Sequence, residues 1–274
     1  MPEPSVAIVI VSFNVRGDLA RCLESLDGGT APYPSTVVVV DNRSTDGTLE
    51  WLRAARPDVM AIDAGGNLGF ARANNLGIRA TSSDLVLLLN PDTVVPPGAV
   101  AALVGALLAT PAAAAAGPRL VDAAGRPELS FGPMIGPWAE FRQRRLVRAY
   151  EAGHPWAVAA VQRLTSEAGP RDWVSGACLL VRRRDLEAVG LLDERYFMYT
   201  EDVDLCAALR AAGREVRFVP EATIAHLRGR SGATAPAATE QMRRISQLAF
   251  YRKHHPRWAP LLAWWLRRRG VHVR

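Results

Sequence analysis

A strict alternation of two apolar patterns along the first 110 residues constrains the fold more than any other feature. Short runs rich in β-branched residues and leucine predict buried strands at Val6–Ser12, Thr36–Asp41, Val59–Asp63 and Leu85–Leu89. Segments with helical apolar spacing follow them, at Asp18–Leu26, Thr48–Ala55, Phe70–Ala80 and Gly98–Ala109. Strands and helices in strict turn form parallel βαβ units, with right-handed connections and helices on both sheet faces. We therefore expect an α/β fold with a mostly parallel central sheet.

Composition is consistent with an ordinary globular protein. The chain has 274 residues, of which 49% are hydrophobic and 22% charged, enough for one large domain or two modest ones. Cys22, Cys178 and Cys206 lack metal-ligand or redox spacing, so we predict reduced core residues in a cytosolic protein. The N-terminal apolar run is too short for a signal peptide. The segment 99–117 is interrupted by Pro111 and predicts a buried helix followed by a strand, rather than a membrane span.

The C-terminal segment carries the excess positive charge. Residues 243–274 contain nine Lys or Arg and no acidic residue, and since the whole chain carries +6, the first 242 residues sum to about −3. Trp258, Trp264 and Trp265 lie in the same segment. Tryptophan beside arginine on a short apolar helix suits an anionic membrane surface. A terminal helix that packs on the domain with a solvated basic edge explains the same pattern, and both interpretations stay open.

Polar residues follow three of the predicted strands, in the segments Ser12–Asn14, Asp41–Ser44 and Asn90–Asp92. In parallel sheets, ligands bind outside the carboxyl ends of the strands. One carboxylate there could be a helix cap or a turn residue, but three polar strand ends together favour a binding site. The glycine-rich loop 64–75 has neither dinucleotide nor Walker A spacing. It either forms a tight turn with a cap or brings backbone N–H groups near a phosphate.

The regular pattern weakens between Arg119 and Arg171, where prolines and glycines interrupt it. We expect a mobile excursion with a short helix there, and such a segment over a ligand site would act as a lid. Further elements are predicted as strands at 173–183 and 215–220 and a helix at 197–213. Glu201 and Asp202 lie near the start of that helix. The helix dipole favours carboxylates at this end by about 0.3–1 kcal/mol, which is a purely structural reason for them.

Seven motifs occur in a specific order: VIVSFN, VVVVDNRSTDGT, NLGFARANN, LLLNPDT, VSGACLLVRR, YTEDVDLC and the segment around His226. In this order they resemble the family 2 glycosyltransferases of the GT-A fold, particularly the rhamnosyltransferase-like branch. The resemblance covers about Val6 to Ser231. It implies a nucleotide-sugar-binding half at 1–121, the excursion or lid at 122–172 and an acceptor-binding, catalytic half at 173–232. A basic, Trp-rich helical tail follows at 233–274.

The resemblance implies a nucleotide-diphosphate sugar as donor and Mg²⁺ or Mn²⁺ as cofactor. Ser12 and Phe13 would lie against the nucleobase, with Asn14 beside them, and Asp41 would accept a hydrogen bond from the base. The loop that approaches the nucleotide and diphosphate would contribute Asn67, Gly69, Arg72 and Asn74. Asp92 matches the metal-binding carboxylate of the family, and Asn90 precedes it in the motif. His226 matches a position that coordinates the metal or touches the diphosphate in some relatives.

On the acceptor side, Asp202 matches the general base of the family. Glu201 is expected to orient the loop or the acceptor, and Trp173 and Gly176 are acceptor or loop residues. Arg228 and Arg230 either steady the diphosphate or are surface arginines. Direct displacement with one carboxylate base implies inversion at the anomeric carbon, and general-base help is typically worth about 10²–10⁴-fold.

Two positions depart from the family pattern. Asn42 stands where many members have a second Asp after the base-binding one, and Asn90 stands where the first Asp of the metal motif often lies. Asp92 is then the only charged ligand in that motif. A metal shared with the diphosphate is chemically acceptable, because Mg²⁺ usually keeps waters and binds through one or two carboxylates plus phosphates.

The expected function is therefore an inverting hexosyltransferase of glycan or cell-wall biosynthesis that uses a dTDP- or UDP-sugar, with dTDP-rhamnose suggested by the branch. The expected acceptor is a glycan or a polyprenyl-linked sugar at the cytoplasmic membrane face, and nucleic acid is not expected as a partner. A nucleotidyltransferase would need a basic, glycine-rich loop after the first strand, where only Arg16 and Gly17 occur. The other alternative is a catalytically inactive nucleotide-sugar-binding protein, against which the intact Asp92 and Asp202 argue.

Overall fold

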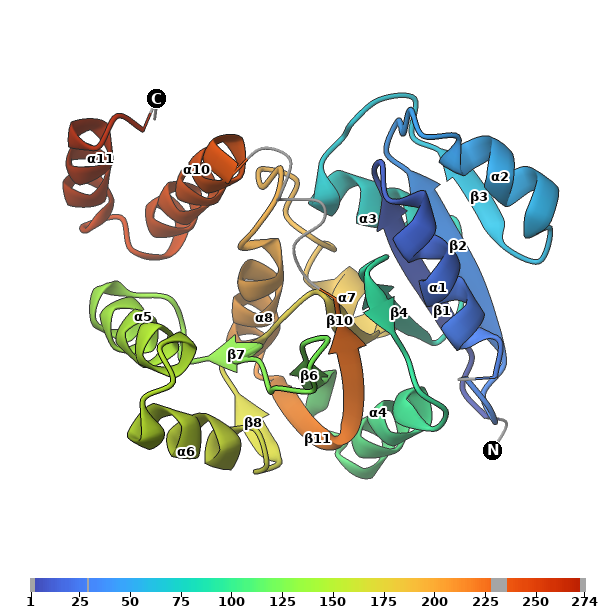
Figure 1. Ribbon diagram of the computed structural model, residues 1–274, viewed down its shortest axis with the longest axis horizontal. Helices are drawn as coiled ribbons and strands as arrows, with labels where there is room; N and C mark the ends of the chain where they lie inside the picture. Colours follow the sequence, from blue (N-terminus) through green and yellow to red (C-terminus); the bar gives the residue numbers. More distant parts are fainter. Residues whose placement is uncertain (1–2, 29, 228–235, 272–274) are drawn as a thin grey trace.

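A computed structural model describes residues 3–28, 30–227 and 236–271 (Figure 1). Within these residues, nine strands form one sheet in the order β3-β2-β1-β4-β10-β6-β11-β5, with β8 paired to β11. The strands of this sheet are β1 (Val6–Ser12), β2 (Ser35–Asp41), β3 (Met60–Asp63), β4 (Leu85–Leu89), β5 (Thr93–Val94), β6 (Ala113–Val121), β8 (Gly169–Arg171), β10 (Cys178–Arg182) and β11 (Glu215–His226). The predicted α/β class is confirmed.

The first four strands form the parallel part of the sheet. β1 pairs with β2 and β4, and β2 pairs with β3, all in parallel. All residues of β1 and β4 are buried, which explains their unbroken apolar runs, because both faces of the sheet are covered. The register places Ser12 beside Asp41 and Asp41 beside Asp63. The polar strand ends therefore lie along one rim, as the sequence predicts.

The other half of the sheet is mixed. β10 runs antiparallel to both β4 and β6, while β11 runs parallel to β6 and antiparallel to β5 and β8. The predicted strand at 173–183 is divided into β9 (Trp173–Val174) and β10, with Gly176 between them. The predicted strand at 215–220 continues to His226. Parallel pairing thus dominates only where strand and helix alternate strictly.

Helices cover both faces of the sheet. α1 (Arg16–Leu26), α2 (Thr48–Ala55) and α4 (Ala99–Ala109) pack on one face, where Leu23, Leu52 and Leu103 share a buried cluster with β1 and β4. α3 (Phe70–Arg79), α7 (Arg183–Ala188) and α8 (Glu201–Ala211) pack on the other face. All three cysteines are buried free thiols, and burial raises the pKa of Cys22 to about 12. The prediction of reduced core cysteines is confirmed.

The excursion contains more structure than the expected short helix. It forms α5 (Pro137–Glu151) and α6 (Pro155–Leu164), each with a proline in its first turn, where the missing N–H costs nothing. A short strand β7 (Phe131–Gly132) pairs with β9. α5 buries only Ala149 among its residues, so it lacks the broad apolar stripe that identifies a helix in a sequence. The lid function stays a prediction.

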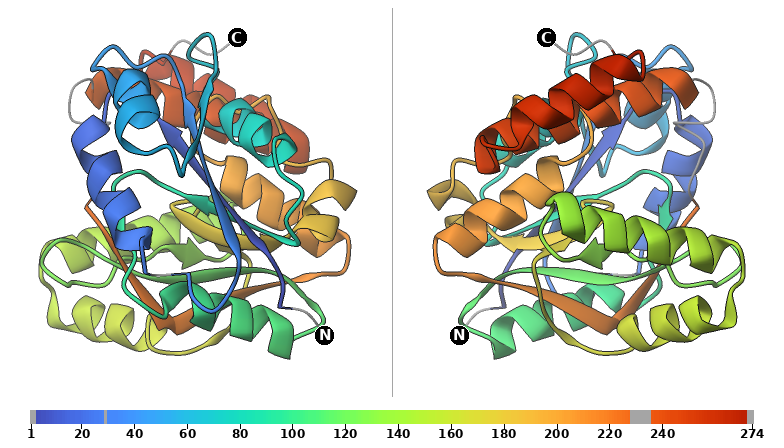
Figure 2. Two further views of the ribbon diagram at one scale, coloured as in Figure 1. Left: turned by 90° about the vertical axis from the view of Figure 1, so that its right-hand side faces the viewer. Right: turned by 90° about the vertical axis from the view of Figure 1, so that its left-hand side faces the viewer.

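The C-terminal segment forms α10 (Pro236–His254) and α11 (Ala259–Arg268). Phe250, Tyr251 and Leu266 pack with Tyr196 and Val203 in a separate cluster. Figures 1 and 2 show α5, α10 and α11 together on one side of the molecule, away from β1–β3. The helical tail expected at 233–274 thus consists of two helices, of which α10 is the longer. Within the described ranges, no helix combines the length and apolar character that crossing a bilayer requires.

Candidate active site

Ser12 and Asp41 present unsatisfied polar atoms at the carboxyl ends of β1 and β2. Ser12 Oγ and Asp41 Oδ1 are buried and have no hydrogen-bond partner among the described residues. The other carboxylate oxygen, Asp41 Oδ2, accepts a hydrogen bond of 2.9 Å from the Ser44 amide. Buried polar atoms are almost always paired, so an orphaned hydroxyl and carboxylate oxygen side by side indicate a missing ligand. Phe13, next to Ser12, is 43% exposed and offers a ring face on which a base could stack.

Asn14 is hydrogen-bonded to the loop that follows β2. Its backbone adopts φ 55°, and its Oδ1 accepts a 2.7 Å hydrogen bond from the Thr45 amide. The backbone N–H of Asn14 in turn donates to Ser44 Oγ at 2.9 Å. Asparagine tolerates this left-handed conformation better than most residues. Asn14 therefore shapes the base-binding end of the rim by joining two of its loops.

The hydrogen bonds of Asn42 give a physical reason for its departure from the family pattern. Its Nδ2 donates to Asn67 Oδ1 at 3.0 Å, and its Oδ1 accepts from the Leu68 amide at 2.7 Å. An ionised aspartate could only accept, so it would lose the bond to Asn67. The neutral amide thus fixes the glycine-rich loop against the end of β2.

Gly69 allows this loop to touch the segment that leads to α8. It has φ 80°, and a Cβ atom there would lie 2.3 Å from the Phe197 carbonyl oxygen. The Phe70 amide donates to the same carbonyl at 2.6 Å. Further along, Arg72 Nε lies 3.5 Å from Glu194 Oε2, and the buried Asn74 donates within α3 to the Phe70 carbonyl. The structure therefore brings Asn67 and Gly69 into the loop contact, whereas Asn74 is occupied inside its own helix.

Asp92 and His226 lie together beyond β4. β5 and β11 pair Thr93 with His226, and His226 Nε2 lies 3.3 Å from Asp92 Oδ1. His226 Nδ1 lies 3.3 Å from Glu128 Oε2 on the other side of the ring. Burial lowers the pKa of His226, but the hydrogen bonds and charges of Asp92 and Glu128 outweigh it and raise the pKa to about 9. Glu128 was missed in the sequence, where no spacing connects it to His226.

These residues fit a divalent metal only in part. In the part of the chain that the structure describes, no cluster of three or more His, Cys, Asp or Glu could hold an ion. The Asp92 and His226 atoms, 3.3 Å apart, are close to the separation of about 3.0 Å between neighbouring ligands of an octahedral ion with 2.1 Å bonds. Two protein ligands with phosphates and waters are sufficient for Mg²⁺ or Mn²⁺. A neutral His226 is required for coordination, so binding would displace its proton.

Asp202 lies in the first turn of α8, directly after two strained residues. Tyr199 and Thr200 have φ 70° and φ 76°, and non-glycine residues in this conformation cost about 1–2 kcal/mol each. Such strain is often found at functional sites. Asp202 Oδ2 accepts a 2.8 Å hydrogen bond from the Gly176 amide, and Oδ1 accepts one from the Val203 amide. Burial raises the pKa of Asp202, although these backbone bonds oppose the shift.

Gly176 connects the Asp202 carboxylate to the rim. A Cβ atom at Gly176 would lie 3.1 Å from Asp202 Cβ, so the close approach depends on glycine. The next residue, Ala177, accepts a 2.9 Å hydrogen bond from the Asn90 amide. Two consecutive residues therefore contact Asp202 and the Asp92 segment. This arrangement places a carboxylate beside the rim.

Glu201 is more enclosed than its neighbour. It is 5% exposed, and its Oε2 has no partner among the described residues. Burial, and then the charge of Asp202, raise the pKa of Glu201 well above the ordinary glutamate value. Burial and the neighbouring carboxylate thus disfavour the charged form of Glu201.

A cavity of about 290 Å³, here called the helical cavity, opens beside Asp202. It lies between α5, the start of α8 and α10, and its walls include Trp173, Arg144, Arg243 and Arg244. Trp173 Nε1 donates to the Pro133 carbonyl at 2.9 Å, which fixes the indole at this wall. The α5 and α10 residues of the cavity were missed, because their helices were not predicted as parts of the site. The predicted Arg228 and Arg230 lie outside the described residues.

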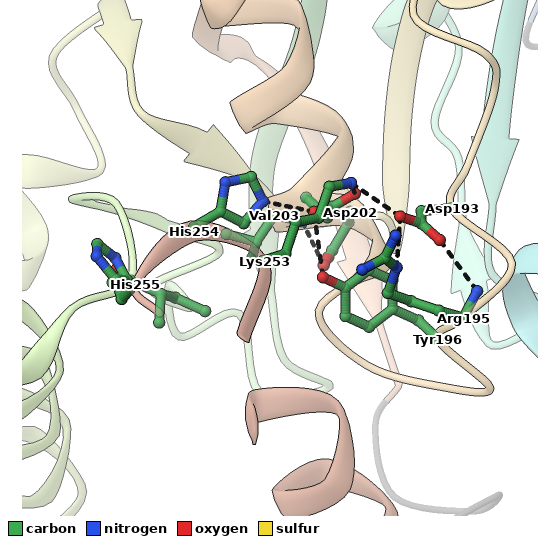
Figure 3. A network of polar contacts seen from close by, with 10 residues as sticks. Asp193, Arg195, Tyr196, Asp202, Val203, Lys253, His254 and His255 are labelled. Carbon is green, nitrogen blue, oxygen red and sulfur yellow. Dashed lines mark hydrogen bonds and ion pairs between the residues drawn. The ribbon is translucent and has the colours of Figure 1, made fainter. Parts of the chain in front are cut away.

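An ion network around the buried Asp204 joins α8 to α10 (Figure 3). Asp204, whose side chain is 3% exposed, accepts from Lys253 Nζ at 2.7 Å and from the Tyr196 hydroxyl at 3.1 Å, and His254 Nε2 lies 2.7 Å from its Oδ1. Lys253 also contacts Asp193 Oδ2 at 2.8 Å. The only feature of the sequence that could have drawn attention to this network is that Lys253 is the sole lysine in a chain with 33 Lys and Arg together.

Comparisons with known proteins identify the family of this chain. The family model "Glycosyltransferase like family 2" matches residues 2–260. An N-acetylglucosaminyl-diphospho-decaprenol L-rhamnosyltransferase of Mycobacterium tuberculosis is 36% identical over 282 residues, which cover 95% of this chain and 88% of the relative. The rhamnosyltransferase WbbL of Escherichia coli is 26% identical over 78% of this chain and 80% of its own.

Two solved structures share the fold. The mannosyltransferase PcManGT from Pyrobaculum calidifontis, in complex with GDP-Man and Mn²⁺, has a TM-score of 0.63 at 18% identity and covers 96% of this chain and 69% of its own. GalNAc-T7 with UDP, GalNAc and Mn²⁺ has a TM-score of 0.63 at 17% identity, over 84% of this chain and 44% of its own. The nucleotidyltransferase and inactive-binder alternatives have no support among these matches. The chain belongs to the glycosyltransferase-like family 2, and it is a glycosyltransferase enzyme with the GT-A fold.

Proposed function

We propose that this enzyme transfers rhamnose, with inversion, from a nucleoside-diphosphate donor to a sugar carried on a polyprenyl diphosphate. The position of Asp202 carries the proposal, because this partly buried carboxylate touches Gly176 beside the rim and also lines the helical cavity. The rim supplies unsatisfied polar atoms for a nucleotide, and the cavity supplies room for an acceptor. The printed activity of the mycobacterial relative supports the sugar and the acceptor class.

In the proposed reaction, an acceptor hydroxyl in the helical cavity attacks the anomeric carbon of the donor sugar. The new carbon–oxygen bond forms as the bond to the donor phosphate breaks, and the nucleoside diphosphate leaves with the electron pair. Asp202 takes the proton of the hydroxyl, so the charge of the attacking oxygen does not build up. Because the displacement is direct, the configuration at the anomeric carbon inverts. Ser12, Phe13 and Asp41 hold the nucleobase on the opposite side of the reacting atoms.

Asp92 and His226 are the proposed ligands of a divalent cation, together with the donor diphosphate. Such an ion supplies positive charge against the charge that develops on the leaving diphosphate. The glutamate on the far side of His226, Glu128, orients the imidazole as an outer partner of the ligand. The Mn²⁺ in the two GT-A neighbours supports a divalent ion without indicating which one this enzyme uses.

The helices around the cavity are proposed to rest on an anionic membrane surface at its cytoplasmic face. Trp138 and Phe141 on α5 are 76% and 62% exposed, and Leu261 and Trp264 on α11 are 56% and 51% exposed. Exposed aromatics on helices with many arginines suit a lipid interface. Arg268 stacks over Trp264 at 4.5 Å, which pairs a cation with the apolar contact. A polyprenyl carrier would meet the protein on this side.

The test combines binding and turnover. Thermal shift with dTDP, UDP and GDP, each with and without Mn²⁺, identifies the donor base, because a bound ligand raises stability by about RT ln(1 + [L]/Kd). Transfer from dTDP-rhamnose to a short-chain polyprenyl diphosphate N-acetylglucosamine is then followed by mass spectrometry, and the anomeric configuration of the product by NMR. We expect stabilisation by one nucleotide and a product with inverted configuration. Absence of transfer, or a product that retains the donor configuration, would contradict the proposal.

A further inference from the structure

We infer that the helical cavity is the subsite for the diphosphate of a lipid-linked acceptor, with Arg144 and Arg243 as its contacts. The inference rests on the proposed function, since it assigns a chemical group to the acceptor side of the same site. Four independent observations support it: the place of the cavity, its size, the state of its arginines and the surface around its mouth.

The place and the size of the helical cavity suit part of an acceptor molecule. Asp202 lines one wall of the cavity, so a hydroxyl that reaches this carboxylate leaves the rest of the acceptor in the cavity. Its volume of about 290 Å³ lies just below the range of about 300–1,000 Å³ for small-ligand sites. This is room for one sugar and the phosphates next to it, but not for the lipid as well. The group that follows the acceptor sugar therefore meets the wall formed by α5 and α10.

That wall carries three arginines against one glutamate. Arg144, Arg243 and Arg244 line the cavity together with Glu140. Glu140 is fully engaged, because its Oε1 accepts from Arg144 at 3.1 Å and from Gln247 at 2.5 Å, and its Oε2 accepts from Tyr251 at 2.7 Å. Glu140 thus fixes α5 against α10 and has little capacity left to repel an anion. Glu240 pairs with both Arg243 and Arg244 on α10, so three guanidinium groups face two carboxylates and the wall keeps an excess of one positive charge.

The arginines differ in how firmly they are held. Arg244 is 14% exposed, bonds to Glu240 at 2.6 Å and to Gln247 at 3.1 Å, and stacks over Trp265 at 5.7 Å. It acts as a positioning residue for the helix. The Arg144 and Arg243 side chains are 39% and 53% exposed. Among the described residues, Arg144 pairs with the partly buried Glu140 and Arg243 with the exposed Glu240, each within its own helix. Such pairs contribute little to stability, so these two guanidinium groups are available for a bidentate contact with phosphate.

The surroundings of the cavity match an amphiphilic acceptor. Behind the arginines, the same helices carry the exposed Trp138 and Phe141 of α5 and Ile245 of α10. The site therefore combines the unsatisfied atoms of the rim, the Asp202 carboxylate, the arginines of the cavity wall and exposed apolar residues on the same helices. These groups match the sugar, the diphosphate and the lipid of one acceptor. A free glycan acceptor would give no reason for the cationic wall.

Binding of geranyl diphosphate tests the subsite without turnover. The donor site is first filled with the nucleoside diphosphate that stabilises the protein, plus Mn²⁺, so that the probe cannot bind there. Wild type, Arg144→Gln and Arg243→Gln are compared by calorimetry with Arg145→Gln, an exposed α5 arginine that does not line the cavity. We expect each cavity variant to bind the probe about tenfold to a hundredfold more weakly, since one charge-assisted contact is lost. Arg145→Gln should bind as wild type does, and geraniol should bind weakly to all four.

Acceptor kinetics separate this inference from the proposed function. With a diphosphate-linked N-acetylglucosamine acceptor, Arg243→Gln should raise KM about tenfold or more at unchanged kcat, whereas an alkyl N-acetylglucosaminide should show no difference from wild type. Equal effects on both acceptors, or wild-type affinity for geranyl diphosphate in both cavity variants, would overturn the subsite. Inorganic diphosphate that competes as well as geranyl diphosphate would indicate a free-phosphate site instead, and this would also overturn it. If the wild type binds the probe through these arginines yet transfers no sugar, the proposed function fails and the anion site stands.

Discussion

The rim and the helical cavity lie side by side, but different forces hold their functional groups. Ser12 and Asp41 end β1 and β2, and Asp92 follows β4; β1 and β4 are buried throughout between two apolar layers. The cavity walls meet through a small apolar cluster and, in addition, through polar contacts between distant helices, such as Glu140 with Tyr251 and Asp204 with Lys253. An apolar sheet fixes backbone positions regardless of charge, whereas a polar network holds only while every partner remains. Substitutions at the rim should therefore change only ligand binding, whereas substitutions in the polar network of the cavity walls should also change the structure.

The largest expected effect is at Asp92. In Asp92→Ala the proposed cation loses its only charged ligand, so metal-dependent stabilisation by the nucleoside diphosphate should disappear. For a ligand at a hundredfold excess over its Kd, this removes about 2.7 kcal/mol of stabilisation. Thermal shift with and without Mn²⁺ measures this metal-dependent stabilisation. The control is Asp84→Ala, at the opposite end of β4, where the carboxylate only bonds Ser5. An equal metal dependence in wild type and Asp92→Ala would exclude the metal role.

The next effect is on nucleobase binding. Asp41→Asn keeps the size of the side chain but replaces an accepting oxygen with a donor, so nucleotide affinity should fall about tenfold to a hundredfold, with or without metal. The melting temperature of the free protein should stay near the wild-type value, because Asp41 Oδ1 has no partner among the described residues. Calorimetry of nucleotide binding checks this. Asp63→Asn, on the neighbouring strand of the same rim, should bind normally. A similar loss in both variants would remove the specific role of Asp41.

A third substitution separates the cavity from the rim. Lys253→Met removes one partner of the buried Asp204, which should lower the free energy of unfolding by about 1–3 kcal/mol. Burial lowers the pKa of Lys253, but its bonds to Asp193 and Asp204 outweigh this and raise it. The stabilisation is therefore present below the ordinary lysine pKa and is lost as pH rises through the raised value. Denaturant unfolding measures the loss, against Arg257→Met as an exposed control.

The Lys253→Met protein should keep wild-type nucleotide affinity while its KM for the acceptor rises, because α10 is displaced but the strand ends are not. If nucleotide affinity falls together with stability, the rim and the cavity do not differ in the way described. A stability equal to that of Arg257→Met would show that the network contributes nothing.

The smallest expected effect is at the membrane surface. Trp264 is about half exposed, and burying the rest of its ring in lipid is worth about 1 kcal/mol. Trp264→Ser should therefore bind vesicles that contain an anionic phospholipid about fivefold more weakly, at unchanged transfer to a short-chain acceptor in detergent. Sedimentation with vesicles measures this, with Leu108→Ser on α4 as an exposed apolar control. Equal binding by the two variants would argue against this surface.

The same contrast explains how much could be predicted from the sequence. The strands of the rim are short apolar runs whose polar ends follow directly in the chain, so β1, β4, Asp41 and Asp92 could be predicted. The cavity depends on contacts across long separations, such as the 111 residues between Glu140 and Tyr251. No periodicity encodes such a pair. Only a short helix was predicted in the excursion for a related reason, since α5 buries a single side chain, Ala149.

Asp202 lies between the two regions and carries the central claim. Its substitution by asparagine keeps the hydrogen bond from Gly176 but removes the proton acceptor. We expect kcat for transfer to fall about 10²–10⁴-fold while nucleotide affinity and melting temperature stay at wild-type values. In the wild type, kcat should fall on acidification at a pH above the ordinary aspartate pKa of 3.8, because burial raises the pKa of Asp202, and the residual activity of Asp202→Asn should lack this step. Near-normal turnover by a folded Asp202→Asn protein would contradict the assignment of Asp202 as the base.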